Sequence, residues 1–207
     1  MKKIISLLVI AVMLMLALTS CSDNVRTKIT KEEWDALDDI TNYTLTSTGT
    51  DTELINNVYY PDDFSGTEKV IENAKYVYRK YDGDSKALEY YYLSDNGETY
   101  RLSKSDDETW LAKTKDWTSE SLLEYITSGE VKFNDLIYNI KTKAYTCTYK
   151  DDDDMTVSYA YYFEDGALVK FDVRISDELG VWRETMTVSN IGTTKLDIPE
   201  YTIESED

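Results

Sequence analysis

Few side chains of this 207-residue chain could do chemistry, and the chain contains no histidine. That absence excludes histidine-based triads, the usual zinc sites and histidine pH switches. Asp151–Asp154 form a run of aspartates whose carboxylates could bind a hard cation such as calcium. The run lacks the spacing and the central glycine of a calcium-binding loop, and it lies between two strand-like segments. We therefore expect a solvated turn there and no metal site.

Glu184 is a second candidate, because it lies between Trp182 and Met186 on one face of an alternating segment. A carboxylate buried on an apolar face has a raised pKa and could act as a general acid. The sequence offers it no identifiable partner carboxylate, so we favour a register shift or an edge position for Glu184. The sequence also lacks the motifs of phosphate loops, dinucleotide sites, serine-hydrolase elbows and redox cysteine pairs. It predicts no enzyme and no cofactor.

The first of two cysteines follows a distinctive segment, residues 1–20, with two lysines near its start and then a long apolar run. With the small residues directly before Cys21, it resembles a bacterial lipoprotein signal peptide and its lipobox. That resemblance implies cleavage before Cys21 and a diacylglycerol on the cysteine sulfur. A secretory signal with a chance cysteine is the alternative. The run is short for a bilayer-spanning helix, which needs about 20 residues. We expect a protein anchored to the cell membrane or envelope, on the extracytoplasmic side.

The second cysteine, Cys147, shares one face of an alternating segment with Tyr145 and Tyr149. With Cys21 lipidated, no internal disulfide can form. We expect Cys147 to be a small buried hydrophobic residue rather than a reactive thiol.

Acidic residues outnumber basic residues by 40 to 22, which gives a formal net charge of −18. Loss of residues 1–20, with two lysines and no acids, lowers the charge to −20. A nucleic-acid partner is excluded, because phosphates need a basic face. Anionic lipid surfaces should also repel the domain within a Debye length of about 8 Å. The lipid on Cys21 is therefore the expected attachment to the membrane.

The chain after the signal peptide fits one domain. Residues 21–29 are expected to be the lipidated cysteine and a short polar tether, and residues 30–207 a single domain. Thr30 and Glu33 match a capping box that opens a short helix with Trp34 on its apolar stripe. A second helix is expected near 119–127, capped by Thr118 or Ser119 and with Leu122 on its apolar stripe.

Between and after these helices the apolar pattern has a period of two, which predicts strands. The expected strands are 42–48, 53–60, 68–81, 87–94, 97–104, 108–114, 144–150, 155–164, 167–175 and 180–190. Turn signals include Thr48–Asp51, Pro61–Asp63 and Asp165-Gly166. Short connections imply antiparallel neighbours, so the predicted fold class is α+β.

The capped Glu32-Glu33-Trp34 helix, Asn42-Tyr43-Thr44, Lys143-Ala144-Tyr145 and the closing Ile191–Pro199 segment resemble many uncharacterised bacterial lipoproteins. The pattern is similar to the superfamily of lipoprotein-carrier proteins and mycobacterial lipoglycan-binding lipoproteins. This resemblance implies a curved antiparallel half-barrel, a few short helices covering its concave face, and acyl chains held between them.

Three functions follow from these observations. The first is a membrane-anchored binding protein with an apolar groove for a lipid or another amphipathic ligand. The groove lining is expected from Tyr145, Tyr149, Tyr159, Tyr161, Trp182, Trp34 and Leu122. The second is a cavity-free surface module that binds protein or glycan through some of its 18 tyrosines. The third, a hydrolase, needs acidic or hydroxyl groups converging on Glu184.

Overall fold

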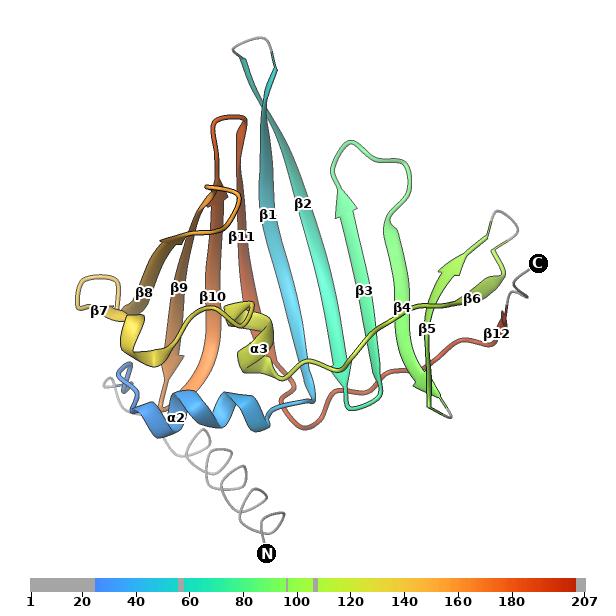
Figure 1. Cartoon of the computed structure of the whole chain (residues 1–207), viewed down its shortest axis with the longest axis horizontal. Helices are drawn as coiled ribbons and strands as arrows, with labels where there is room; N and C mark the ends of the chain where they lie inside the picture. Colours follow the sequence, from blue (N-terminus) through green and yellow to red (C-terminus); the bar gives the residue numbers. More distant parts are fainter. Residues whose placement is uncertain (1–24, 56–57, 96, 106–107, 204–207) are drawn as a thin grey trace, which may run out of the picture.

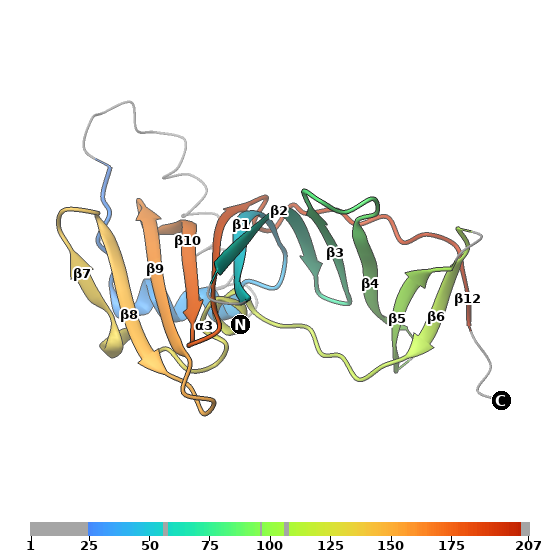
Figure 2. The same ribbon diagram turned by 90° about the horizontal axis from the view of Figure 1, so that it is seen from above.

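The computed structural model describes residues 25–55, 58–95, 97–105 and 108–203, which form an α+β domain around one open, curved sheet (Figure 1). The expected signal peptide and Cys21 lie outside the described residues. Short helices lie against one face of the sheet (Figures 1 and 2). The helices are α2 (Lys31–Asp35), the 3₁₀ turn η1 (Ala36–Asp39), α3 (Leu122–Thr127) and the 3₁₀ turn η2 (Phe133–Asp135).

The strands follow the chain in two antiparallel meanders. They are β1 (Tyr43–Ile55), β2 (Val58–Ile71), β3 (Ala74–Tyr81), β4 (Leu88–Asp95), β5 (Glu98–Lys104), β6 (Trp110–Thr114), β7 (Ile137–Asn139), β8 (Ala144–Lys150), β9 (Thr156–Glu164), β10 (Ala167–Ser176), β11 (Gly180–Ser189) and β12 (Tyr201–Ile203). Their order in the sheet is β12-β6-β5-β4-β3-β2-β1-β11-β10-β9-β8-β7. The meanders join where β1 pairs with β11, and β12 adds a parallel pairing to β6.

The larger core lies between the helices and strands β8–β11 with β1. Trp34 packs edge-on against Tyr161 of β9, with ring centroids 5.2 Å apart, and both side chains are buried. The Tyr161 hydroxyl also donates to the carbonyl of Ile126, 3.0 Å away, which fixes the end of α3 to the sheet. The start of α3 is held by a hydrogen bond from the Leu122 amide to the Ile40 carbonyl. The packing of Trp34 and the hydrogen bonds at the two ends of α3 therefore hold the helices against this face of the sheet.

A second core lies on the opposite face, against β3–β6. It contains Leu93, Tyr100 and Leu102, and the returning chain covers it with Leu196 and Tyr201. Figure 2 shows this segment running along the side of the sheet opposite to α3. The two halves of the sheet thus bury opposite faces.

Two of the expected turns are wrong, because Thr48–Asp51 and Pro61–Asp63 lie inside the long strands β1 and β2. Gly49 is directly opposite Phe64, and a Cβ on Gly49 would lie 2.3 Å from the Phe64 ring. The glycine therefore makes room for an aromatic ring rather than for a turn. Pro61 is tolerated because β3 pairs with β2 only from Phe64 onward, so Pro61 has no β3 neighbour that needs its missing N–H.

The expected strand 68–81 is also divided, by a tight turn between β2 and β3. The second helix begins later than expected. Ser121, rather than Thr118 or Ser119, caps α3 and forms a capping box with Glu124. The expected hairpin through Asp165-Gly166 is confirmed, with both residues at positive φ between β9 and β10.

Candidate functional site

A cavity of about 820 Å³ lies beneath α3 and the chain segment before it, over the apolar face of β9–β11. Its floor is apolar and is lined by Tyr159, Phe171, Val173, Ile175, Trp182 and Met186. Its cover is more polar and includes Thr118, Ser119, Glu120, Glu124, Tyr125 and Ser128. A pocket of this size, with an apolar floor and polar groups on its cover, has the dimensions of a small-ligand site.

Six of the seven side chains expected to line a groove lie in or against the helix-side core, and the seventh, Trp182, stacks on Phe64; they do not all reach the cavity. Tyr159 and Trp182 line it. Trp34, Tyr161 and Leu122 are fully buried in the packed core, and Tyr145 is also buried. Tyr149 is half-buried and stacks on Tyr159, with ring centroids 6.3 Å apart. The cavity therefore occupies only part of the expected groove.

A charged network stands beside the cavity. Arg79 of β3 donates to Glu184 of β11, with Nη2 3.1 Å from Oε1. The guanidinium also lies over the rings of Phe64 and Trp182. Burial raises the pKa of Glu184, and the charge of Arg79 opposes that shift. Because Trp182 lines the cavity, this ion pair supports one of its walls.

Register shift and an edge position, the explanations favoured for Glu184, are both wrong. β11 is paired on both sides, with β1 and β10, and the Glu184 side chain is only 2% exposed. The carboxylate remains on the apolar face because Arg79 reaches it there. The sequence could not reveal this partner, which lies 105 residues away.

Next to this pair, Glu68 accepts a hydrogen bond from the Tyr125 hydroxyl, 2.9 Å away, and pairs with Lys75 at 2.9 Å. Burial, with Glu68 nearby, raises the pKa of Tyr125 well above its ordinary value. Each carboxylate, Glu68 and Glu184, thus has its own cation. This pairing stabilises the wall, and it leaves neither of these two carboxylates without a cation.

The aspartate run forms the expected turn between β8 and β9. The Asp151 carboxylate accepts from the amides of Asp153 and Met155, and the residues of the run that follow Asp151 are exposed. Within the described residues, no three carboxylate, thiol or imidazole groups are placed to hold a metal ion. Cys147 is half-buried against the helix-side core, and burial raises the pKa of its thiol.

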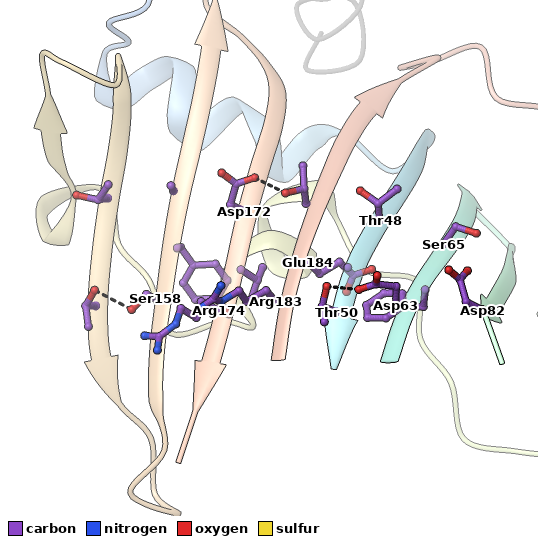
Figure 3. Close-up of a pocket in the computed structure, with 18 residues that line it drawn as sticks. Thr48, Thr50, Asp63, Ser65, Asp82, Ser158, Asp172, Arg174, Arg183 and Glu184 are labelled. Atoms are coloured by element: carbon purple, nitrogen blue, oxygen red, sulfur yellow. Dashed lines mark hydrogen bonds between the residues drawn. The ribbon is translucent and has the colours of Figure 1, made fainter. Parts of the chain in front are cut away.

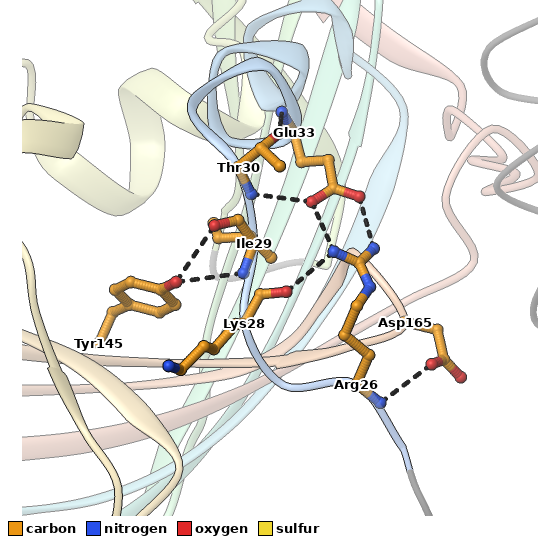
Figure 4. Close-up of polar contacts among 7 residues, drawn as sticks. All are labelled: Arg26, Lys28, Ile29, Thr30, Glu33, Tyr145 and Asp165. Atoms are coloured by element: carbon orange, nitrogen blue, oxygen red, sulfur yellow. Dashed lines mark hydrogen bonds and ion pairs between the residues drawn. The ribbon is translucent and has the colours of Figure 1, made fainter.

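The last residues of the expected tether lie on the domain (Figure 4). The Arg26 guanidinium forms a two-pronged pair with Glu33, with Nη1 2.9 Å from Oε2 and Nη2 2.5 Å from Oε1. Its backbone exchanges hydrogen bonds with Asp165 in the β9–β10 turn. Ile29 is buried, and its amide donates to the Tyr145 hydroxyl, which donates back to the Ile29 carbonyl. The chain is therefore attached to the sheet from Arg26 onward.

A second hollow, of about 880 Å³, lies on the face of the sheet opposite to the helices (Figure 3). Most of the residues that line it carry polar side chains, among them Thr48, Thr50, Asp63, Ser158, Asp172, Arg174 and Arg183. No sequence pattern identifies this hollow. Polar residues alternate along β1, β10 and β11, but only the strand order brings them side by side.

No known protein family matches this sequence, and no curated protein sequence is similar to it. Among solved structures, the chain is similar to a DUF1329 family protein from Desulfovibrio piger, with 9% identity and a TM-score of 0.35. That alignment covers 82% of this chain and 92% of the other. It is also similar to a domain from Vibrio parahaemolyticus described as that of an outer membrane lipoprotein-sorting protein. There the identity is 9%, the TM-score is 0.30, and the alignment covers 76% of this chain and 88% of the other. Likeness at this level assigns neither a family nor a ligand.

Within the described part of the chain, no helix has both the length and the apolar character needed to cross a bilayer.

Proposed function

We propose that this protein is an extracytoplasmic lipoprotein, anchored to the membrane through Cys21, whose domain binds a lipid or another amphipathic molecule beneath α3. The cavity of about 820 Å³ carries this proposal, because its apolar floor suits an acyl chain and its polar cover suits a head group. We infer a binding role rather than an enzymatic one. The nearby carboxylates Glu68 and Glu184 are each paired with a cation, and of the two that line the cavity, Glu124 caps α3 and Glu120 is exposed.

The polar cover favours a particular head group. Glu120 and Glu124 are among its lining residues, and no lysine or arginine of the described chain lines the cavity. The Ser119 hydroxyl lines the cavity too, and it is buried without a hydrogen-bond partner. A ligand hydroxyl or amine could pair with these groups, whereas a ligand carboxylate would be repelled. We therefore expect a neutral or cationic amphipathic ligand.

The attachment of Arg26 supports a short anchor. Arg26 lies five positions after Cys21 in the sequence, a distance of at most about 18 Å when the chain is extended. A lipid on Cys21 would therefore hold the end of the domain that contains α2 and the β9–β10 turn close to the bilayer. This arrangement fits a location in the cell envelope.

The alternative, an interaction module without a cavity, needs a filled interior and an exposed aromatic surface. The cavity beneath α3 argues against it. So does the placement of the tyrosines, because Tyr60 is the only tyrosine among the exposed large apolar side chains of the described residues.

The binding proposal is tested with the full chain in a non-ionic detergent, titrated with a fluorescent diacylglycerol and with the fatty acid that carries the same fluorophore. Probe emission should rise with the diacylglycerol and less with the fatty acid. Ile175→Trp, which fills the cavity, should abolish the rise. The matched control is Ser176→Trp, at the next position of β10 and on the opposite face, which should leave it unchanged. Equal responses from the two variants, or no response from the natural chain, would contradict the proposal.

The anchor is tested separately. Cys21→Ala should release the protein from membranes or mislocalise it while leaving the circular dichroism spectrum of the domain unchanged. Continued membrane association of a cleaved Cys21→Ala protein would disprove lipid anchoring at this residue.

A further inference from the structure

A single row of polar side chains crosses six strands on the face of the sheet away from the helices. Backbone pairing places these residues side by side in the order Thr148, Ser158, Arg174, Arg183, Thr50 and Asp63. Neighbouring strands are about 4.8 Å apart, so the row is about 24 Å long. The labelled members follow one another across Figure 3 in this order, within the hollow of about 880 Å³.

The two arginines at the centre of the row are the unusual feature. Arg174 and Arg183 are directly opposite each other on β10 and β11, where like charges repel. Both side chains are exposed, and within the described residues neither forms an ion pair or a side-chain hydrogen bond. This is unexpected in a chain with 40 acidic and 22 basic residues. The pair therefore lacks a structural role in the domain itself.

Two carboxylates that line the same hollow, Asp63 and Asp172, are engaged elsewhere. Asp63 accepts from the Thr50 hydroxyl at 2.5 Å. Asp172 accepts from the hydroxyls of Thr185 and Tyr162, at 2.8 and 2.9 Å. The two guanidiniums thus offer free donors in a hollow whose other lining groups include hydroxyls, the bonded carboxylates of Asp63 and Asp172, and the exposed carboxylate of Asp82 on the far side of β2.

From this arrangement we infer that the outer hollow binds an anionic sugar, with its carboxylate or phosphate held between Arg174 and Arg183. Guanidinium groups bind both oxyanions with paired, charge-assisted hydrogen bonds. Thr50, Ser158 and Asp63 flank the arginines and can bond sugar hydroxyls. An oxyanion between the guanidiniums would also relieve their mutual repulsion. This site is independent of the cavity beneath α3, because the sheet separates the two.

The test is isothermal titration calorimetry of the full chain in non-ionic detergent with three probes: galacturonate, glucose 6-phosphate and neutral glucose. The first two distinguish a carboxylate from a phosphate ligand, and binding of either supports the inference. Binding should weaken as the salt concentration rises. Arg174→Gln and Arg183→Gln should each reduce affinity at least about tenfold, and the double variant should abolish binding. Lys86→Gln makes the same charge change at an exposed position outside the hollow and should have no effect.

Thermal unfolding without ligand provides a second readout. Each arginine substitution should leave the midpoint unchanged or raise it slightly, because it removes a repulsive pair. The inference is overturned if neither anion binds at about 10 mM. It is equally overturned if glucose binds as well as the anions, or if the double variant keeps its affinity. Ile175→Trp should leave anion binding intact, which separates this result from the fate of the lipid proposal.

Discussion

Arg79 on β3 reaches Glu184 on β11 across two intervening strands, with 3.1 Å between guanidinium and carboxylate. The backbone positions beneath this bridge are small. Gly66 is directly opposite Arg79, and Gly49 is directly opposite Glu184. Because these glycines have no side chains, the ion pair can lie close to the backbone of the sheet. It links the two meanders beside the wall of the cavity.

Breaking this pair should be costly. Glu184→Leu leaves the Arg79 guanidinium without its carboxylate and should lower the free energy of unfolding by about 3 kcal/mol. Arg79→Met combined with Glu184→Leu should restore most of that loss, because no uncompensated charge remains. Urea denaturation of the two single variants and the double variant measures the coupling. If the double variant lost as much unfolding free energy as the two single variants together, the two side chains would act independently.

Gly49 should not tolerate a side chain. A Cβ there would lie 2.3 Å from the Phe64 ring and 2.4 Å from the Arg183 carbonyl oxygen. We expect Gly49→Ala to lower the free energy of unfolding by about 1–3 kcal/mol. Gly83→Ala is the control, since its Cβ would meet nothing within 4 Å, and it should change stability by less than about 0.5 kcal/mol. Equal effects of the two substitutions would contradict this packing.

The second core should unfold independently of the first. Leu196 packs on the face of β3–β6 that is opposite to the helices, together with Leu102 and Ala112. Leu196→Asp should lower the free energy of unfolding by about 2 kcal/mol, because it places a charge on that core. Hydrogen exchange should accelerate in β5 and β6 and remain slow in β9 and β10. Uniform acceleration across the sheet would show instead that the two cores unfold as one unit.

Attachment of the N-terminal segment should depend on pH through Glu33. The hydrogen bond from Arg26, helped by the Thr30 amide, lowers the pKa of Glu33 in the folded protein. Its contribution is therefore complete above the ordinary glutamate pKa of about 4.3 and is lost as the pH falls through the lowered value.

Exchange protection of the Ile29 amide, which bonds to Tyr145, reports on this attachment. Protection should be high near neutral pH and should fall on acidification. Glu33→Gln should weaken protection already at neutral pH, whereas Glu32→Gln, at the exposed neighbouring position, should not. Protection that does not change with pH in the natural chain would rule out this role of Glu33.

Local patterns predicted much of this fold. The capping box at Thr30 and Glu33, the alternation in β8–β11 and the turn at Asp165-Gly166 depend on neighbouring residues, and the structure contains them all. Gly49 and Pro61 were misinterpreted as turn residues because their tolerance within strands depends on Phe64 and on where β3 ends. Those conditions belong to strand pairing, which the sequence does not display.

The candidate site was predicted less well for the same reason. Tyr159 and Trp182 line the cavity, but which aromatic residues pack tightly and which leave space depends on where α3 sits. The partnership of Arg79 with Glu184 and that of Arg174 with Arg183 both require the strand order. Composition and periodicity carry no information about that order.

The attachment of residues 26–29 also determines how the domain would bear a mechanical load. Tension applied to the chain before Arg26 would pass to Asp165 in the β9–β10 turn and to Tyr145 on β8. It would pass as well to the edge strand β7, because the Thr27 hydroxyl is hydrogen-bonded to that of Tyr138, 2.6 Å away. Pulling the N-terminus would thus load the β7 end of the sheet together with its interior, while β12, at the opposite edge, stays outside the path of the force.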